Sequence, residues 1–229
     1  MKQPIPTEII EELRQFDAAT LSNAVERLDI RDRIEGFASR EVRCRFPELP
    51  PMIGYAVTCT ADSTYPGKPR PNKLRDLIDA VEAAPKPAVV VMQNTGHDSL
   101  KSCFIGDMIC AAYQKLGAVG VVTDGGYRDL EGIRKRAPGF HIFGPGCVVS
   151  HGNVVIMDVG IPVTVGGMPV EPSDLLHGDD NGVLRIPNER AADVVEKAKV
   201  VQDVEGRLFD YLEKNDSVTA EDLKRELGI

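Results

Sequence analysis

The sequence lacks the patterns that mark several common classes of protein. Its 229 residues contain no C-x-x-C pair and no H-E-x-x-H, and the four histidines are dispersed. The five cysteines are odd in number and scattered, which argues against a disulfide framework and against a zinc site. The absence of G-x-x-x-x-G-K-[ST] and of G-x-S-x-G excludes a P-loop nucleotide site and a serine-hydrolase elbow.

Long apolar segments and linkers are missing as well. No run of about 18 apolar residues occurs, and residues 1–6 lack the apolar core of a signal peptide. No Ser/Gly-rich linker or long charge run divides the chain. We therefore expect a cytoplasmic protein without a membrane segment, folded as one domain over residues 1–229.

Acidic residues outnumber basic residues. The net charge is −8 and the sequence pI about 5.1. Such a surface repels phosphate backbones, which argues against nucleic acid as a partner. Basic residues cluster only locally, and we interpret both clusters as solvated faces. The first comprises Lys68, Arg70, Lys73 and Arg75, and the second Arg134, Lys135 and Arg136.

Apolar periodicity predicts alternating helices and strands in the first 136 residues. Continuous apolar runs at 88–92 and 118–123 predict buried strands, as expected for a parallel sheet covered on both faces. Residues 74–136 thus follow the order helix, strand, helix, strand, helix, which is typical of a βαβ arrangement. The expected helices are 7–16, 20–28, 74–84, 106–116 and 129–136, the further strand is 54–61, and the loops and turns are 64–72, 94–105 and 124–127.

The remaining residues change in character. Short strands are expected at 147–149, 154–157 and 163–165, separated by Gly, Pro and Asn. Residues 178–182, Gly-Asp-Asp-Asn-Gly, predict a hairpin turn inside 175–186. An apolar stripe predicts a long helix over 188–214, and Thr219-x-x-Asp222 resembles a capping box that opens a last helix.

The most distinctive segment ends the strand at 118–123. A Gly-rich turn there delivers Arg128 and Asp129 side by side. Ligands gather at the carboxyl ends of strands in α/β sheets. A guanidinium suits the oxygens of a 2-oxo acid, and a carboxylate is a hard ligand for Mg²⁺ or Mn²⁺. The alternative is that Arg128 is a turn residue and Asp129 a helix N-cap.

A second feature precedes the helix expected at 106–116. The first amides of that helix have no intrahelical partner and form an anion site. Gly106 lets a ligand approach the backbone, and Asp107 is either a cap or an acid near the metal. Both features follow consecutive parallel strands, so their loops should be neighbours. Together they would stabilise a pyruvate enolate.

Other candidate residues are weaker. Gly144-Pro-Gly146 carries half of a dinucleotide fingerprint, but Val149 stands at the third glycine position, so we reject a Rossmann site. His97 lies in a predicted surface loop and could reach a ligand there. Asp179 and Asp180 are interpreted as turn residues rather than metal ligands.

These motifs resemble a known family. Asp107, twenty intervening residues and then Arg128-Asp129 are similar to the signature of the class II pyruvate aldolases of the 4-hydroxy-4-methyl-2-oxoglutarate type. That family includes the RraA-like proteins, named for a regulator of RNase E activity. The resemblance covers residues 17–187 and implies an α/β fold: a three-layer β/β/α swivelling-type domain, with C-terminal helices over 188–229 as an extension.

The resemblance also implies roles for individual residues. The amides around Gly106, Asp107, Met108 and Ile109 would hold the pyruvyl oxygens, and Arg128 would bind and polarise the same end of the substrate. Asp129 would be the direct ligand of Mg²⁺, with Asp107 acting through a water. The family further implies a homo-oligomer, a trimer or a hexamer, with sites at the contacts between subunits.

The sequence departs from the family pattern at Gly132, where the family often has an acidic residue, and Glu131 precedes it. The aldolases also take an acid from a neighbouring subunit, for which Glu189, Glu196 and Glu205 are the candidates here.

Three functions follow as hypotheses. The leading one is a lyase that cleaves a 4-hydroxy-2-oxo acid or decarboxylates oxaloacetate through one shared enolate. The others are a protein inhibitor of RNase E, which should tolerate loss of Arg128, and a same-fold enzyme with other chemistry on a related 2-oxo or sugar acid.

Overall fold

The computed structural model describes residues 5–67 and 71–228. Within these residues the main sheet has eight strands, in the order β1-β7-β5-β3-β2-β11-β12, and β8 also pairs with β2. Two smaller sheets pair β9 with β10 and β4 with β6. The strands are β1 (Arg43–Cys44), β2 (Met52–Asp62), β3 (Ala88–Asn94), β4 (Cys103–Ile105), β5 (Ala118–Thr123), β6 (Gly126–Tyr127), β7 (His141–Gly144), β8 (Val155–Val159), β9 (Val163–Val165), β10 (Met168–Val170), β11 (Leu175–Asp179) and β12 (Gly182–Ile186).

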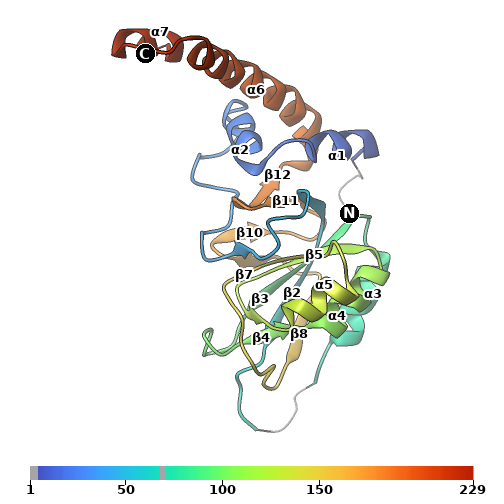
Figure 1. The fold of residues 1–229 in the computed structure, drawn as a ribbon. Coiled ribbons are helices and arrows are strands. Elements are labelled where there is room, and N and C mark those ends of the chain that lie inside the picture. Colours follow the sequence, from blue (N-terminus) through green and yellow to red (C-terminus); the bar gives the residue numbers. More distant parts are fainter. Residues whose placement is uncertain (1–4, 68–70, 229) are drawn as a thin grey trace.

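Helices cover one face of the main sheet and one of its ends (Figure 1). The helices α3, α4 and α5 pack on one face, while α1, α2 and α6 lie beside β11 and β12. The helices are α1 (Thr7–Leu13), α2 (Ala18–Glu26), α3 (Leu74–Ala83), α4 (Asp107–Lys115), α5 (Leu130–Arg136), α6 (Ala191–Lys214) and α7 (Ala220–Leu227), with a 3-10 turn η1 (Asn188–Arg190) before α6.

The centre of the sheet consists of three parallel strands. β2 pairs with β3 and β3 with β5, so that Val57, Val90 and Val121 lie side by side. Every residue of β2 is buried, and so are the first five residues of β3. Apolar side chains are needed on both faces of such strands, which explains their continuous rather than alternating apolar sequence.

Three layers result from this burial. Alternate residues of β3 enter two different clusters: Val90 joins the core with α3, α4 and α5, whereas Val89 joins the core with β9 and β10. The small β9–β10 hairpin thus forms the third layer, opposite the helices. The predicted β/β/α architecture with a C-terminal helical extension is confirmed.

Most of the predicted elements are confirmed, and a few are corrected. The strand predicted at 147–149 is wrong: the strand of this region is β7, His141–Gly144, and Cys147 makes only an isolated bridge to Tyr127. The loop predicted at 94–105 contains β4, the turn at 124–127 contains β6, and β10 was not predicted. The hairpin and the capping box at Thr219 are confirmed. The single-domain organisation stays a prediction.

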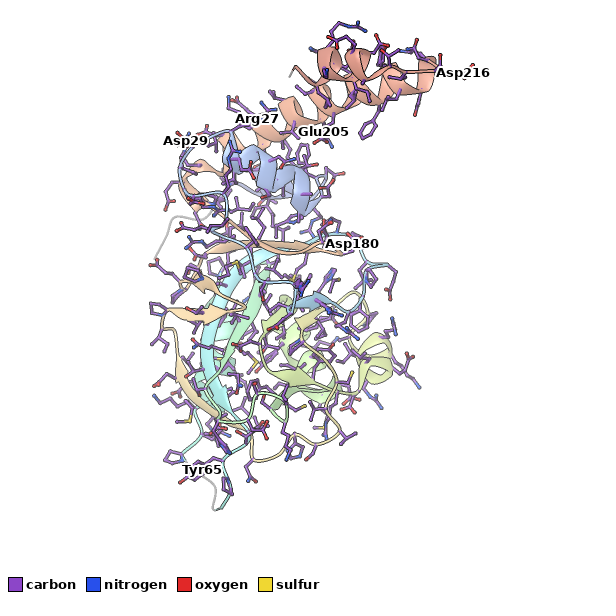
Figure 2. All side chains as sticks on the ribbon, turned by 90° about the vertical axis from the view of Figure 1, so that its left-hand side faces the viewer. Arg27, Asp29, Tyr65, Asp180, Glu205 and Asp216 are labelled. Atoms are coloured by element: carbon purple, nitrogen blue, oxygen red, sulfur yellow. The ribbon has the colours of Figure 1, made fainter. Side chains whose placement is uncertain are left out.

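The C-terminal helices extend away from the sheet (Figure 2). In α6, no residue after Val201 is buried, and none of α7 is. The loop with Asp216 lies far from the hairpin that carries Asp180 (Figure 2). Among the residues that the structure describes, no helix is long and apolar enough to cross a membrane.

Candidate active site

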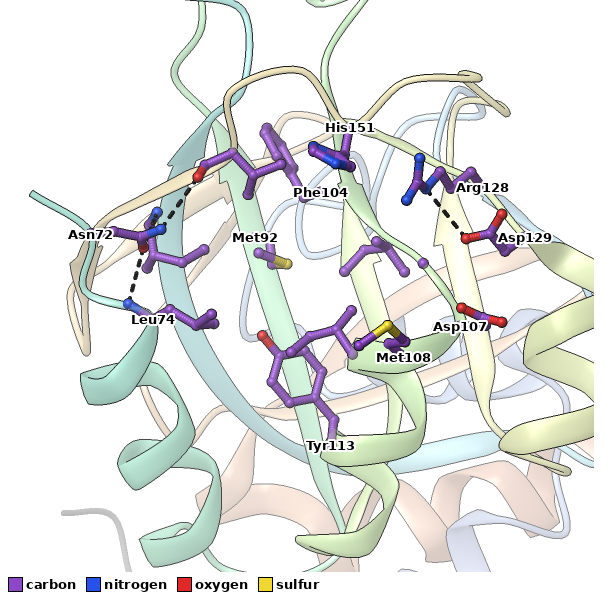
Figure 3. A pocket seen from close by; sticks show the side chains of 15 residues that line it. Asn72, Leu74, Met92, Phe104, Asp107, Met108, Tyr113, Arg128, Asp129 and His151 are labelled. Carbon is purple, nitrogen blue, oxygen red and sulfur yellow. Dashed lines mark hydrogen bonds and ion pairs between the residues drawn. The ribbon is translucent and has the colours of Figure 1, made fainter. Parts of the chain in front are cut away.

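All six residues predicted as site residues line one pocket. It has a volume of about 230 Å³ and lies where α4 begins, beside the segment that joins β5 to α5. Figure 3 shows Asp107, Arg128 and Asp129 together at one end of this pocket. The six residues are Gly106, Asp107, Met108, Ile109, Arg128 and Asp129.

The turn before Arg128 is fixed by close backbone packing. Asp124 follows β5 and accepts a hydrogen bond of 2.6 Å from the backbone N–H of Asn94, at the end of β3. A Cβ atom at Gly125 would lie 2.2 Å from the Phe104 ring, and one at Gly126 only 2.4 Å from the Ser102 carbonyl oxygen. The two glycines are therefore required for close approach of the 102–105 segment.

The same segment sets the position of Arg128. The Arg128 backbone N–H donates to the Ile105 carbonyl over 2.9 Å, immediately before Gly106 and helix α4. Consecutive parallel strands thus bring the two predicted loops together, as the sequence indicated. The Arg128 side chain is 36% exposed and donates to the Val149 carbonyl through Nη1 over 3.4 Å. Its remaining N–H groups leave donor capacity for a ligand.

Asp129 precedes α5 but does not cap it with its side chain. Its backbone is left-handed, with φ of 62°, and its carboxylate accepts no capping hydrogen bond. Instead, Oδ2 lies 3.3 Å from Nε of Arg128, and the side chain is 41% exposed. A non-glycine residue in this conformation is uncommon and strained. The N-cap alternative therefore lacks the contact that defines a cap.

Asp107 stands in the first turn of α4 and is held from α5. Its Oδ2 accepts a 2.6 Å hydrogen bond from Nη1 of Arg136. Gly132 makes room for this ion pair, because a Cβ atom there would lie 2.5 Å from Asp107 Oδ2 and 3.0 Å from Arg136 Nη1. The interpretation of Arg136 as part of a solvated face is thus incomplete. An acidic side chain at position 132 would displace this ion pair.

The residues present fit a divalent cation held mainly by water. Within residues 5–67 and 71–228, no group of three or more His, Cys, Asp or Glu side chains gathers as a metal site. Mg²⁺ does not need one, since it keeps several waters and takes one or two carboxylates. The carboxylate of Asp129 packs closely on Gly106: a Cβ atom there would lie 2.9 Å from Oδ2, so glycine is needed for the carboxylate to take this position.

Burial changes the pKa of several titratable groups in and near the pocket. Burial raises the pKa of the Cys110 thiol to about 12. Burial also raises the pKa of Tyr113, whose side chain lines the pocket. Both groups therefore stay protonated and uncharged. Burial likewise raises the pKa of Asp124, partly offset by its hydrogen bond from Asn94.

Sequence reasoning missed two polar residues of the pocket, Asn72 and His151. Both lie in loops far along the chain from the Asp…Arg-Asp motif, so no local signal pointed to them. His97, the weaker candidate, does not line this pocket and stands 3.4 Å from the Thr64 hydroxyl through Nδ1. Of the first basic cluster, Lys68 and Arg70 lie outside the described residues.

The acids considered for a neighbouring subunit are distant from this pocket in their own chain. Glu189 belongs to η1, and Glu196 and Glu205 to α6. Figure 1 shows α6 beyond β11 and β12, whereas α4 lies beside the lower strands. In Figure 2, Glu205 stands near Arg27, where α6 leaves the sheet. Any contribution of these acids to the pocket therefore requires a second copy of the chain.

Comparison with known proteins yields one family. The pattern described as RraA-like (Aldolase/RraA) matches residues 18–185. The DlpA protein of Legionella pneumophila is 28% identical over 159 residues, which are 69% of this chain and 25% of DlpA. A Halalkalibacterium halodurans protein named "Putative 4-hydroxy-4-methyl-2-oxoglutarate aldolase" is 33% identical over 125 residues, 53% of this chain and 56% of that protein. The match thus spans a quarter to just over half of these relatives.

Solved structures share the fold. An uncharacterized protein from Pseudomonas syringae pv. tomato superposes with a TM-score of 0.74 at 23% identity, covering 94% of this chain and 92% of that one. RraAS2 of Streptomyces coelicolor, described as an unusual member of the RNase ES inhibitor RraA family, superposes with a TM-score of 0.70 at 22% identity, covering 93% and 100%. The likeness extends over nearly the whole chain.

Proposed function

Because the chain belongs to the RraA-like (Aldolase/RraA) family, we propose that it is a divalent-metal-dependent lyase acting on a small 2-oxo acid. The observation that carries this proposal is the adjacent pair Arg128 and Asp129, facing the start of α4 in one pocket. Relatives named as aldolases support a lyase at the level of the family. The reaction proposed is retro-aldol cleavage of a 4-hydroxy-2-oxo acid, decarboxylation of oxaloacetate, or both.

Arg128 and the first amides of α4 would bind the 2-oxo acid end. The guanidinium fork can hold two oxygens in one plane, and the amides at residues 106–109 carry partial positive charge. Both cleavage and decarboxylation leave electrons on the pyruvyl fragment as an enolate. Donors fixed before the reaction stabilise that developing charge without reorganisation, and this is the largest contribution expected from the chain.

Asp129 and Asp107 would hold the cation, Asp129 directly and Asp107 through a water. Mg²⁺ or Mn²⁺, when bound, supplies Lewis-acid stabilisation of negative charge on the substrate oxygen. The carboxylate of Asp129 is suited to this role because it caps no helix and remains partly exposed. Arg136 would orient Asp107 through their 2.6 Å contact.

The test is a pyruvate-release screen over 4-hydroxy-2-oxo acids and oxaloacetate, with and without Mg²⁺. We expect turnover that EDTA removes and that Asp129→Asn lowers by about a hundredfold or more. Asp216→Asn is the matched control, since Asp216 is exposed and lies far from the pocket. Turnover that survives both EDTA and Asp129→Asn would overturn the metal role. No pyruvate from any acid tested would overturn the lyase proposal.

A further inference from the structure

The two ends of the pocket differ in chemistry. Asp107, Arg128 and Asp129 form the polar end, and the opposite wall consists mainly of apolar side chains from α3, β3, β4, α4 and the segment that begins β8 (Figure 3). This apolar wall comprises Leu74, Met92, Phe104, Tyr113, Val154 and Ile156. A substrate whose 2-oxo acid group lies at the polar end would place its other end against this wall.

The wall is rigid and largely withdrawn from water. Met92 and Tyr113 are each 1% exposed and Ile156 is 2% exposed, so the pocket ends on core side chains. A charged group brought against such a surface loses most of its hydration, whereas an apolar group gains by burial. Each buried methylene strengthens binding by about fourfold.

The amide of Asn72, which lies on the same side, is already engaged. Its Oδ1 accepts from the backbone N–H of Leu74 over 3.1 Å and of Ile156 over 3.0 Å. Its Nδ2 donates to the Val154 carbonyl over 3.3 Å. Asn72 therefore joins the start of α3 to β8 and fixes three residues of the apolar wall. Using this amide to bind a carboxylate would break those contacts.

We propose that the substrate of this enzyme carries an uncharged alkyl or aryl group at the end away from its 2-oxo acid. The apolar wall selects that group, and a second carboxylate at the same position is rejected. This inference rests on the proposed function, because it assumes that the 2-oxo acid end binds at Arg128. It separates this chain from enzymes whose substrates carry a second carboxylate far enough from the 2-oxo acid to reach this wall.

Binding of unreactive 2-oxo acids tests the proposal without turnover. Titration calorimetry with Mg²⁺ would compare pyruvate, 2-oxohexanoate and 2-oxoadipate, of which the last two have the same chain length and differ by a terminal carboxylate. We expect 2-oxohexanoate to bind at least tenfold more tightly than either of the others. Equal or tighter binding of 2-oxoadipate would overturn this inference but leave the proposed function standing. Failure of all three acids to bind would overturn both.

A variant at the rim of the pocket sharpens the result. Leu74 is 36% exposed at the start of α3, so Leu74→Arg can fold normally and places a cation on the apolar wall. We expect it to shift the preference toward 2-oxoadipate by tenfold or more. Leu100→Arg is the control, because Leu100 is 87% exposed and does not line the pocket. An unchanged preference in Leu74→Arg, or the same shift in Leu100→Arg, would show that the wall does not contact the distal group.

Discussion

The polar end of the pocket and the second half of α6 differ in how tightly the rest of the same chain packs around them. Around Arg128, the 102–105 segment and two glycines pack backbone against backbone, with separations that no larger residue would permit. Beyond Val201, α6 buries none of its residues and exposes Val204 and Phe209. A single chain thus fixes the backbone around Arg128, whereas the C-terminal helices leave apolar surface that a partner could cover.

The largest effect expected within this comparison is on catalysis. Arg128→Lys keeps the charge but loses the planar donor fork, so we expect kcat/KM on oxaloacetate to fall by about a hundredfold. Steady-state kinetics measures this, with a thermal melt to exclude unfolding. If Arg128 is only a turn residue, the lysine variant should retain kcat/KM within twofold of the parent, and that result would contradict a catalytic role for Arg128.

Acid should lower the free energy of unfolding of the sheet, which contains His177, rather than the stability of the C-terminal helices. Burial lowers the pKa of His177, on β11, to about 4, although Asp179 partly opposes the shift. The unfolded chain takes up a proton at about pH 6.5 and the folded chain does not, so stability falls between these pH values. The loss is on the order of 3 kcal/mol at pH 4 relative to pH 7.

Denaturant unfolding followed by circular dichroism at several pH values would measure this loss. His177→Leu should remove it, and the difference between the two pH profiles isolates the histidine from the carboxylates. His151→Gln is the control, because His151 is exposed. Parallel pH profiles for the parent and His177→Leu would rule out the assignment.

Paired glycine variants test the two regions directly. Gly125→Ala forces a Cβ atom against Phe104, and we expect a loss of about 1–3 kcal/mol in the free energy of unfolding. A Cβ atom at Gly206, in the exposed part of α6, would meet nothing within 4 Å. Gly206→Ala should therefore be neutral or stabilising by up to about 1 kcal/mol. Equal effects of the two variants would remove the distinction between the regions.

The smallest effect that we expect is on the oligomeric state. We predict a homo-oligomer, trimeric or hexameric, that uses the exposed apolar residues of α6. Phe209 is 60% exposed, and Phe209→Asp should shift the mass seen by light scattering toward the 24.9 kDa monomer. Gln202→Asp adds the same charge at an exposed position of the helix and should not. A parent protein that is monomeric at micromolar concentration would contradict the prediction.

The sequence predicted the centre of the fold well because strands that are buried on both faces are continuous apolar runs in the local sequence. Continuous apolar runs identify β3 and β5, and the parallel pairing of these strands brings their following loops to one edge. The candidate site follows from that topology, so the sequence alone was enough to locate Arg128 and Asp129. β7 was not predicted because it has only four residues, between Pro138-Gly139 and Pro145.

The rest of the site depends on contacts between distant parts of the chain. Asn72 reaches β8 through hydrogen bonds to residues more than 80 positions away. Arg136 binds Asp107, which lies 29 positions earlier in the chain. The need for glycine at position 132 becomes apparent only from the positions of these two side chains. The left-handed backbone of Asp129 is equally invisible in sequence, since Asp before a helix usually indicates a side-chain cap.

The most direct test of the site is a crystal structure with Mn²⁺ in place of Mg²⁺ and with pyruvate bound. We predict an anomalous peak about 2.0–2.2 Å from a carboxylate oxygen of Asp129. We also predict that the pyruvate oxygens lie between the Arg128 guanidinium and the first amides of α4. A manganese peak that does not touch Asp129, or pyruvate bound away from Arg128 at saturating concentrations of both, would contradict the central claim.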